Sequence, residues 1–360
     1  MKKQSNFIRS DRRTFLKTSS LGLAAIAFPF PEIPAFMKGI PMGIVVHSYG
    51  ARWHSKVESN TYPGFKDALD LMNHCHKIGA GGIQVGVNGW QSDFAKNVRD
   101  QREKLGMYLE GSIGLPKTKN EVAAFESEVK AAKEAGATVL RTVCLSGRRY
   151  ENFHSAQEFQ AFKSNAMESI HLAIPIIEKY KIKLAIENHK DWKAAELAAI
   201  IRDFDNEWLG VTLDFGNNVS LIEDPNEVIK TLAPLAFSTH IKDMGVKKYA
   251  DGFLLSEVPL GEGIVDVKVG VNLCRKYNPN ITFSLEMITR DPLKIPCLTD
   301  EYWATFEETK GAEFEKVMAM IEKNEFKSQL PSTSNLDSEG RLAFEEANVL
   351  ECIKFSRKVI

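Results

Sequence analysis

Short apolar runs alternate with longer amphipathic segments along most of the chain, starting near residue 41. The apolar runs have the length of buried strands, and they lie at residues 43–50, 81–87, 107–116, 138–145, 183–189, 209–216, 235–243 and 281–287. The segments between these runs have the spacing of helices that bury one face. Strands that alternate with helices indicate a parallel sheet covered by helices. Eight such units in roughly 290 residues predict an α/β fold with a single closed (β/α)8 TIM barrel.

The same pattern divides the chain into three parts. Residues 38–326 contain the alternating pattern without a linker-like interruption, so we expect them to form one barrel domain. Residues 327–360 begin with a polar Ser/Pro/Asn stretch and continue as the helical pattern "GRLAFEEANVLECIKFSRKVI", which predicts a C-terminal helical extension. Residues 1–37 follow neither pattern, and we interpret them as an export signal and linker.

The N-terminal segment has a basic region, an apolar stretch at 21–30 and then several prolines. Its "RRTFLK" at 12–17 resembles a twin-arginine export signal, although Asp11 stands where that signal usually has Ser or Thr. The apolar stretch is shorter than the roughly 20 residues that span a bilayer, which favours a signal over a membrane anchor. We therefore expect export to the periplasm without a stable membrane anchor. The alternative is a solvated basic arm.

Composition excludes several classes of function. Of 360 residues, 44% are hydrophobic and 26% charged, which is typical of a globular protein. The formal net charge is −1, and no basic block follows the first residues, so we expect no nucleic-acid partner. The five cysteines are odd in number and irregularly spaced, which fits neither a disulfide framework nor a CxxC zinc site.

Four consecutive predicted strands, the fifth to the eighth, end on side chains that can bind a metal. These residues are Glu187, Asp214, His240 and Glu286. Two residues before each of them lies a small side chain, namely Ala185, Thr212, Ser238 and Ser284. Side chains alternate between the two faces of a barrel strand, and functional groups project from the carboxyl ends of the strands. The four polar residues should therefore point inward at one height, above small residues that leave room for a ligand.

Three carboxylates placed this close together repel one another at neutral pH unless a cation lies among them. A buried carboxylate also costs several kcal/mol unless it is paired, hydrogen-bonded or bound to a metal. Three carboxylates and one imidazole suit Mn²⁺, Mg²⁺, Zn²⁺ or Co²⁺ and leave positions for substrate oxygens. The pattern thus predicts one divalent metal ion. The alternative is a set of unrelated polar strand ends.

The motifs around these residues resemble those of the xylose isomerase-like TIM barrels, often called sugar phosphate isomerases/epimerases. The matching segments are "IENH" (186–189), "LDFGN" (213–217), "HIKD" (240–243), "GEGIVD" (261–266) and "LEM" (285–287). The resemblance implies that the four ligands bind one divalent metal ion. It also implies that Glu187 and Glu286 are the catalytic residues, which exchange protons with the substrate. No histidine follows closely after Asp214, which argues against the related nucleases that use three zinc ions.

The resemblance implies a divalent-metal-dependent isomerase or epimerase that acts through an enediolate. We expect an unphosphorylated sugar or keto-sugar as substrate, because an exported enzyme rarely meets sugar phosphates and the sequence has no Gly-rich phosphate loop. One alternative is a lyase or hydrolase that cleaves 3-keto-glycosides by β-elimination at the same site. An alternative of another class is a non-catalytic carbohydrate-binding barrel, against which the presence of both glutamates argues. The sequence is compatible with a homo-oligomer as well as with a monomer.

Further polar residues lie at or just after strand ends and are candidates for binding substrate hydroxyls. These are His47, Arg141, His189, Lys190 and Lys242. For each of them a structural salt bridge or loop contact is the alternative. For Lys242 this alternative is an ion pair with its neighbour Asp243, which would steady the loop that leads to Gly261. We expect residues 245–259, together with the loops after the first four strands, to shape the pocket.

Overall fold

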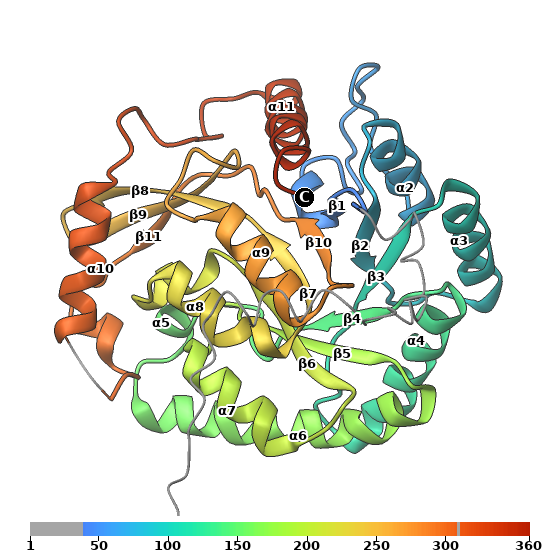
Figure 1. Ribbon diagram of the computed structural model, residues 1–360, viewed down its shortest axis with the longest axis horizontal. Helices are drawn as coiled ribbons and strands as arrows, with labels where there is room; N and C mark the ends of the chain where they lie inside the picture. The colour runs from blue at the N-terminus through green and yellow to red at the C-terminus, as the bar shows by residue number, and fades with distance from the viewer. Residues whose placement is uncertain (1–38, 308–309) are drawn as a thin grey trace, which may run out of the picture. The chain divides into compact units, whose positions relative to one another are not determined.

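Eight parallel strands close into a barrel in the computed structural model, which describes residues 39–307 and 310–360 (Figure 1). The closed order is β1-β10-β7-β6-β5-β4-β3-β2. The barrel strands are β1 (Gly43–Val45), β2 (Gly82–Gly86), β3 (Tyr108–Ser112), β4 (Val139–Thr142), β5 (Lys183–Glu187), β6 (Leu209–Asp214), β7 (Ala236–Ile241) and β10 (Thr282–Leu285). Each of them lies within one of the eight predicted runs, so the predicted barrel is confirmed. The proposed export signal at 1–37 lies outside the described residues.

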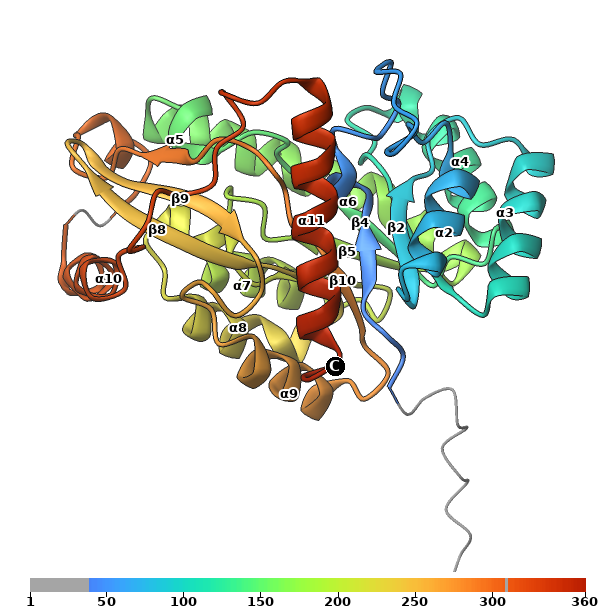
Figure 2. The ribbon, with the colours of Figure 1, turned by 90° about the horizontal axis from the view of Figure 1, so that it is seen from above.

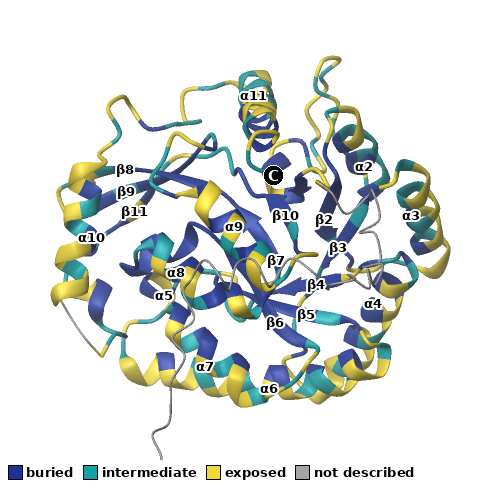
Figure 3. Ribbon diagram, in the orientation of Figure 1, coloured by how far each residue is buried: buried dark blue, intermediate teal, exposed yellow. Residues whose placement is uncertain are grey.

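Helices surround the barrel and bury their inner faces against it. Figure 3 shows dark blue strands in the centre and yellow, exposed surfaces on the outer helices. The α-helices of this layer are α2 (Ala68–Lys77), α3 (Ser92–Leu105), α4 (Val122–Glu134), α5 (Arg149–Asn152), α6 (Ala156–Tyr180), α7 (Ala194–Phe204), α8 (Pro225–Leu232) and α9 (Val267–Tyr277). Short 3-10 helices are η2 (Val46–Tyr49), η3 (Lys119–Glu121), η4 (Asn217–Leu221), η5 (Ala233–Leu235) and η6 (Glu301–Trp303).

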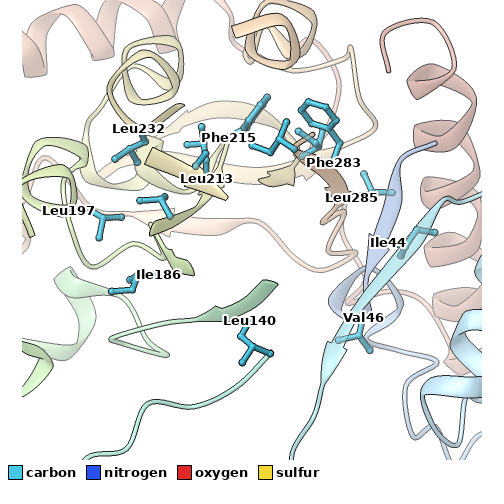
Figure 4. Close-up of a cluster of buried hydrophobic side chains, with 14 of the residues drawn as sticks. Ile44, Val46, Leu140, Ile186, Leu197, Leu213, Phe215, Leu232, Phe283 and Leu285 are labelled. Atoms are coloured by element: carbon cyan, nitrogen blue, oxygen red, sulfur yellow. The ribbon is translucent and has the colours of Figure 1, made fainter. Parts of the chain in front are cut away.

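The two faces of each strand have different roles. Large apolar side chains such as Ile186, Leu213 and Leu285 are fully buried in the cluster between the barrel and its helices (Figure 4). The small residues that alternate with them face the barrel interior, where the Oγ1 of Thr212 lies 2.9 Å from the Oγ of Ser238. Burial of apolar surface thus fixes the register of the strands, because a slip by one residue would turn every side chain to the wrong face.

Tyr108 closes the barrel below the strand ends that carry the polar residues. It lies at the start of β3, and its hydroxyl donates to the carbonyl of Phe283 at 2.9 Å and accepts from the backbone N–H of Gly43 at 2.9 Å. Any Cβ at Gly43 or Gly82 would come within 2.3 Å of atoms of Tyr108, so both positions require glycine. The amino end of the barrel is therefore filled by side chains, and a ligand must enter from the carboxyl end.

An antiparallel sheet interrupts the regular alternation after β7. It consists of β8 (Asp243–Tyr249), β9 (Gly252–Val258) and β11 (Leu293–Ile295), in the order β11-β9-β8. In Figure 1 it lies to one side of the barrel, next to α10. The sequence analysis took most of β8 and β9 for a pocket-forming segment and missed the strands. The (β/α) pattern leads one to expect a helix after β7, whereas here a tight turn at residues 250–251 folds the chain into a hairpin.

The predicted C-terminal helical extension is confirmed by α11 (Ser338–Ser356), and a further helix, α10 (Ala312–Lys323), precedes the predicted extension. Figure 2 shows α11 running alongside β1 and β10. The buried carboxylate of Glu345 accepts from the backbone N–H groups of Ala51 and Arg52 at 2.6 and 3.1 Å. Asn348 donates to the Thr289 hydroxyl at 2.9 Å. Helix α11 therefore holds the loops that follow the first and the last barrel strand.

Within residues 39–307 and 310–360, we find no helix that combines the length and the apolar character needed to cross a membrane.

Candidate metal centre and active site

The four predicted metal ligands come together at the carboxyl ends of four adjacent strands. Glu187 and Asp214 are the last residues of β5 and β6, His240 lies near the end of β7, and Glu286 directly follows β10. All four side chains are buried, and one ligand atom from each lies within 4.8 Å of the others. The Nδ1 of His240 lies 3.5, 3.8 and 3.6 Å from carboxylate oxygens of Glu187, Asp214 and Glu286, respectively. The site thus has the composition that the sequence predicts.

The donor set fits one divalent cation. Buried Oδ2 of Asp214 and Nδ1 of His240 both lack a hydrogen-bond partner among the described residues, and both belong to the cluster. Metal–ligand bonds of about 2.0–2.2 Å place any two ligands no more than about 4.4 Å apart, which the distances from His240 satisfy. A metal ion would give both atoms a bond, in addition to the ion pair that Oδ2 of Asp214 makes with Lys242 at 2.9 Å. We therefore assign Glu187, Asp214, His240 and Glu286 as the residues that would hold it.

Two further buried residues orient His240, and the sequence analysis missed both. The amide of Gln84, in β2, donates through Nε2 to Glu110 in β3 at 2.8 Å. Its Oε1 therefore faces the Nε2 of His240, at 2.7 Å, and must accept a hydrogen bond from the Nε2–H. This arrangement leaves Nδ1 to face the carboxylates as a metal ligand. Polar residues inside the apolar runs "GGIQVGV" and "MYLEGS" were the available signal.

Replacing Gln84 with leucine should weaken metal binding about 10–100-fold, because His240 loses the acceptor that fixes its ring and its tautomer. Isothermal titration with Mn²⁺ measures this effect. Gln91→Leu, at the exposed start of α3, is the matched control and should bind metal as the wild type does. An unchanged affinity in Gln84→Leu would show that the contact does not orient the ligand.

Glu187 is held as a carboxylate by two neighbours. The Nε of Arg141 donates to its Oε2 at 2.6 Å, and the amide of Asn217 donates to its Oε1 at 2.9 Å. Burial by itself would raise the pKa of Glu187, but the positive charges of Arg141 and His240 outweigh it and keep the pKa well below its usual value. Arg141, which was predicted to bind substrate, thus contacts a metal ligand directly.

Lys242 forms ion pairs with the other two carboxylate ligands, Asp214 and Glu286. Its buried Nζ lies 2.5 Å from Glu286 and 2.9 Å from Asp214. Burial would raise the pKa of Glu286, but Lys242 and His240 hold it well below its usual value. For Asp214 the effect of burial is larger than that of Lys242 and raises the pKa to about 6. One ammonium group therefore offsets only part of the repulsion among three carboxylates.

The alternative ion pair between Lys242 and Asp243 is wrong. Asp243 instead accepts the backbone N–H groups of Met244 at 2.8 Å and of Gly261, Gly263 and Val265 at 2.9 Å. These bonds leave its carboxylate no free direction toward Lys242. Asp243 steadies the loop that leads into α9, and Lys242 is left to pair with the metal ligands.

The other predicted binding residues lie at different distances from the cluster. His47 is half-exposed, and its Nδ1 lies 3.0 Å from Glu286. Lys190 donates to the side-chain oxygen of Asn217 and does not contact a metal ligand. His189 turns its Nδ1 to the carbonyl of Leu145 at 3.0 Å, and burial lowers its pKa to about 3. The structure thus places His47, Arg141 and Lys242 in contact with the metal ligands. Lys190 contacts Asn217, which itself contacts the ligands, and His189 makes a loop contact.

Asn217, which the sequence analysis did not single out, links several of these groups. Its backbone N–H donates to Asp214 at 2.7 Å, and its side chain contacts Glu187, Lys190 and Lys242. Arg290, in the loop after β10, and Glu257, in β9, form another missed pair with contacts of 2.5 and 3.1 Å. Glu257 comes from the unpredicted hairpin, and no local sequence signal connects it with Arg290.

A closed (β/α)8 barrel with buried polar residues gathered at the carboxyl ends of its strands has the architecture of TIM-barrel enzymes. Residues 72–313 match the sequence model of the family described as Xylose isomerase-like TIM barrel, and the chain belongs to this family. The family resemblance in the sequence is thereby confirmed.

Comparison with individual proteins agrees with this assignment. The chain is 25% identical to 3-oxo-isoapionate decarboxylase from Pectobacterium atrosepticum over 252 residues, which cover 68% of this chain and 85% of that protein. A D-psicose 3-epimerase solved in the presence of D-fructose has a TM-score of 0.56 at 17% identity, covering 89% of this chain and 99% of that one. A Mycobacterium smegmatis protein of the same family, solved in complex with magnesium, has a TM-score of 0.53 at 16% identity, covering 80% and 98%. These structures are similar to the chain in fold.

Proposed function

We propose that the protein is a divalent-metal-dependent isomerase or epimerase of an unphosphorylated sugar or keto-sugar. The observation that carries the proposal is a pair of buried glutamates, Glu187 and Glu286, in one metal-binding cluster. They come from the two outermost of four adjacent strands, so they approach a ligand from different sides. Membership of the Xylose isomerase-like TIM barrel family and the similarity in fold to a D-psicose 3-epimerase support the proposal.

The chemistry is the transfer of a proton at the carbon next to a carbonyl group. A bound divalent ion would polarise the carbonyl and stabilise the negative charge that develops on its oxygen. One glutamate removes the proton as general base, and the other returns a proton as general acid to the opposite face or to the neighbouring carbon. Arg141 and Asn217 hold Glu187 in place for this role, and Lys242 and His47 hold Glu286. The half-exposed His47 can exchange protons between Glu286 and solvent.

A lyase is the second candidate, and the similarity to a decarboxylase supports it. Loss of CO₂ from a 3-oxo acid leaves an enolate, the same kind of anion that proton removal creates, so the same electrostatic environment serves both reactions. β-Elimination from a 3-keto-glycoside likewise begins with removal of the proton next to the ketone and ends with departure of the group at the anomeric carbon. All three reactions need a stabilised oxyanion; isomerisation and β-elimination also need a base, whereas decarboxylation needs an acid that protonates the enolate.

We further propose that the protein is exported to the periplasm through the segment at residues 1–37. The support is the twin-arginine pattern at 12–17 followed by an apolar stretch. Cell fractionation with Arg12→Lys/Arg13→Lys as the variant tests export: retention of the variant inside the cell supports it, and unchanged distribution contradicts it.

Proton NMR in D₂O tests the proposed reaction. The metal-loaded protein is incubated with a panel of ketohexoses, ketohexuronates, 3-keto-glycosides and 3-oxo sugar acids. Deuterium incorporation together with an epimerised or isomerised product supports the first candidate, and release of an aglycone or of CO₂ supports the second. A folded, metal-loaded protein that neither exchanges a proton in any of these compounds nor releases an aglycone or CO₂ from them would contradict both.

A further inference from the structure

Lys190 is a buried cation that no carboxylate neutralises. Lys190 is 4% exposed, and its backbone adopts the left-handed conformation, with φ at +68°. Its Nζ donates to the side-chain oxygen of Asn217, which also accepts from Lys242 at 3.3 Å. Among the described residues, no carboxylate oxygen lies within 4.0 Å of this Nζ. Because a buried charge is costly without a counter-charge, the position of Lys190 calls for an anion.

The charges of the whole site lead to the same conclusion. With His240 neutral, as a metal ligand must be, the four acidic side chains Glu187, Asp214, Glu286 and Glu257 are matched in number by four cationic ones, Arg141, Lys190, Lys242 and Arg290. A divalent ion would therefore add two positive charges that no side chain of this set offsets. Asp191, whose pKa burial raises to about 7, can supply one negative charge at most. A neutral sugar would leave the excess positive charge unbalanced.

Arg290 pairs with Glu257, and its charge also acts on Lys190. Burial, then the charges of Lys242 and Arg290, lower the pKa of Lys190 to about 8, so these three cations are close enough to repel one another. Arg290 is 28% exposed, so part of its guanidinium remains accessible beside Glu257. The nearby hydroxyl of Tyr150, a residue 6% exposed, has no hydrogen-bond partner within the described part of the chain. The charge of Arg290 thus acts on both Lys190 and the Tyr150 hydroxyl.

We propose that the substrate carries a carboxylate, which Lys190 and Arg290 bind at the border of the metal site. This inference rests on the proposed function and narrows its substrate class to keto-sugar acids. The carboxylate would be fixed at one end by the two cations while the carbonyl end reaches the glutamates. It would also give the site a means of selecting acids over neutral sugars of the same stereochemistry.

Matched pairs of probes separate the effect of the carboxylate from that of the rest of the sugar. D-Fructose and D-fructuronate, and D-tagatose and D-tagaturonate, differ only in the group at C6. Calorimetric binding to the metal-loaded protein and deuterium exchange in D₂O are measured for all four. We expect the uronates to bind at least about tenfold more tightly than the matching ketoses, with part of this difference due to Lys190.

Lys190→Gln should lower uronate affinity at least about tenfold and change ketose affinity less than about threefold, because glutamine keeps a contact with Asn217 but loses the charge. Lys190→Arg should restore most of the uronate affinity. Lys193→Gln, which changes a partly exposed lysine of the same loop, is the control and should bind all four probes as the wild type does.

A second variant keeps the test independent of position 190. The double change Arg290→Gln/Glu257→Gln removes one charge of each sign and keeps hydrogen-bonding groups in both places; it too should weaken uronate binding selectively. Equal affinity for acids and ketoses in the wild type, or equal losses for both in the Lys190 variant, would overturn the proposal. Selective uronate binding without any proton exchange would instead contradict the proposed function and leave the carboxylate site supported.

Discussion

Glu286→Gln and Glu187→Gln are each expected to lower kcat at least about 10³-fold while the barrel remains folded. Glutamine has nearly the same shape but can neither accept nor return the substrate proton. Each variant should still bind the metal, because three of the four ligands remain. Its affinity for the metal should be lower than that of the wild type, because one ligand is lost. Steady-state kinetics, circular dichroism and metal analysis of the purified variants check the three parts of this expectation.

A control variant must show that the loss of kcat comes from the position of the glutamate in the site and not from the loss of one negative charge in general. Glu196→Gln, in α7 directly after the β5 loop, is the matched control, because Glu196 pairs with Arg149 and Lys163 outside the cluster. It should keep kcat within about twofold. Wild-type turnover in Glu187→Gln or Glu286→Gln would reject the acid–base role of that residue, whatever its metal content.

Removal of the metal is the second change with a large expected effect. Treatment with a chelator should abolish activity, and addition of Mn²⁺, Mg²⁺, Zn²⁺ or Co²⁺ should restore it for the ions that fit. Metal at about 100 times its Kd should also stabilise the fold by about 2.7 kcal/mol, because it binds only the folded cluster. Activity assays and thermal unfolding with and without metal measure both effects. Full activity in a protein shown to be metal-free by elemental analysis would contradict the assignment.

Metal uptake should weaken as the pH falls. A ligand binds the metal only when it is deprotonated, so protons compete with the ion. Burial raises the pKa of Asp214 to about 6. For His240, burial would lower the pKa, but Glu187 and Glu286 outweigh it and raise it to about 10. Titrations at pH 6 and pH 8 should therefore differ at least about tenfold in affinity, with the weaker binding at pH 6. Equal affinities would show that neither ligand is protonated in this range.

The sequence predicted the parts of the site that follow from strand periodicity. Glu187, Asp214, His240 and Glu286 stand at equivalent ends of consecutive strands, and a barrel brings such ends to one rim. The eight barrel strands were predictable for the same reason, since their apolar runs recur at regular intervals. Both predictions depend only on local pattern and on the closure of the sheet.

Contacts made across the barrel were not predictable in this way. Gln84 and Glu110 lie in β2 and β3, and their link to His240 depends on which side chains meet in the interior. The pair of Arg290 and Glu257 depends on a hairpin that replaces the helix expected after β7. Lys242 was predicted to bind substrate, and the alternative was an ion pair with Asp243, because adjacent residues are the simplest pair in a sequence. In the fold they point to different loops, and each finds partners that are distant along the chain.

The central claim is that one divalent ion binds between Glu187, Asp214, His240 and Glu286. Anomalous diffraction from crystals grown with Mn²⁺ tests it most directly. We expect a single strong peak within about 2.0–2.3 Å of the Nδ1 of His240 and of one oxygen from each carboxylate. A peak at another place, or no peak while Lys242 remains the only cation against Asp214 and Glu286, would contradict the claim.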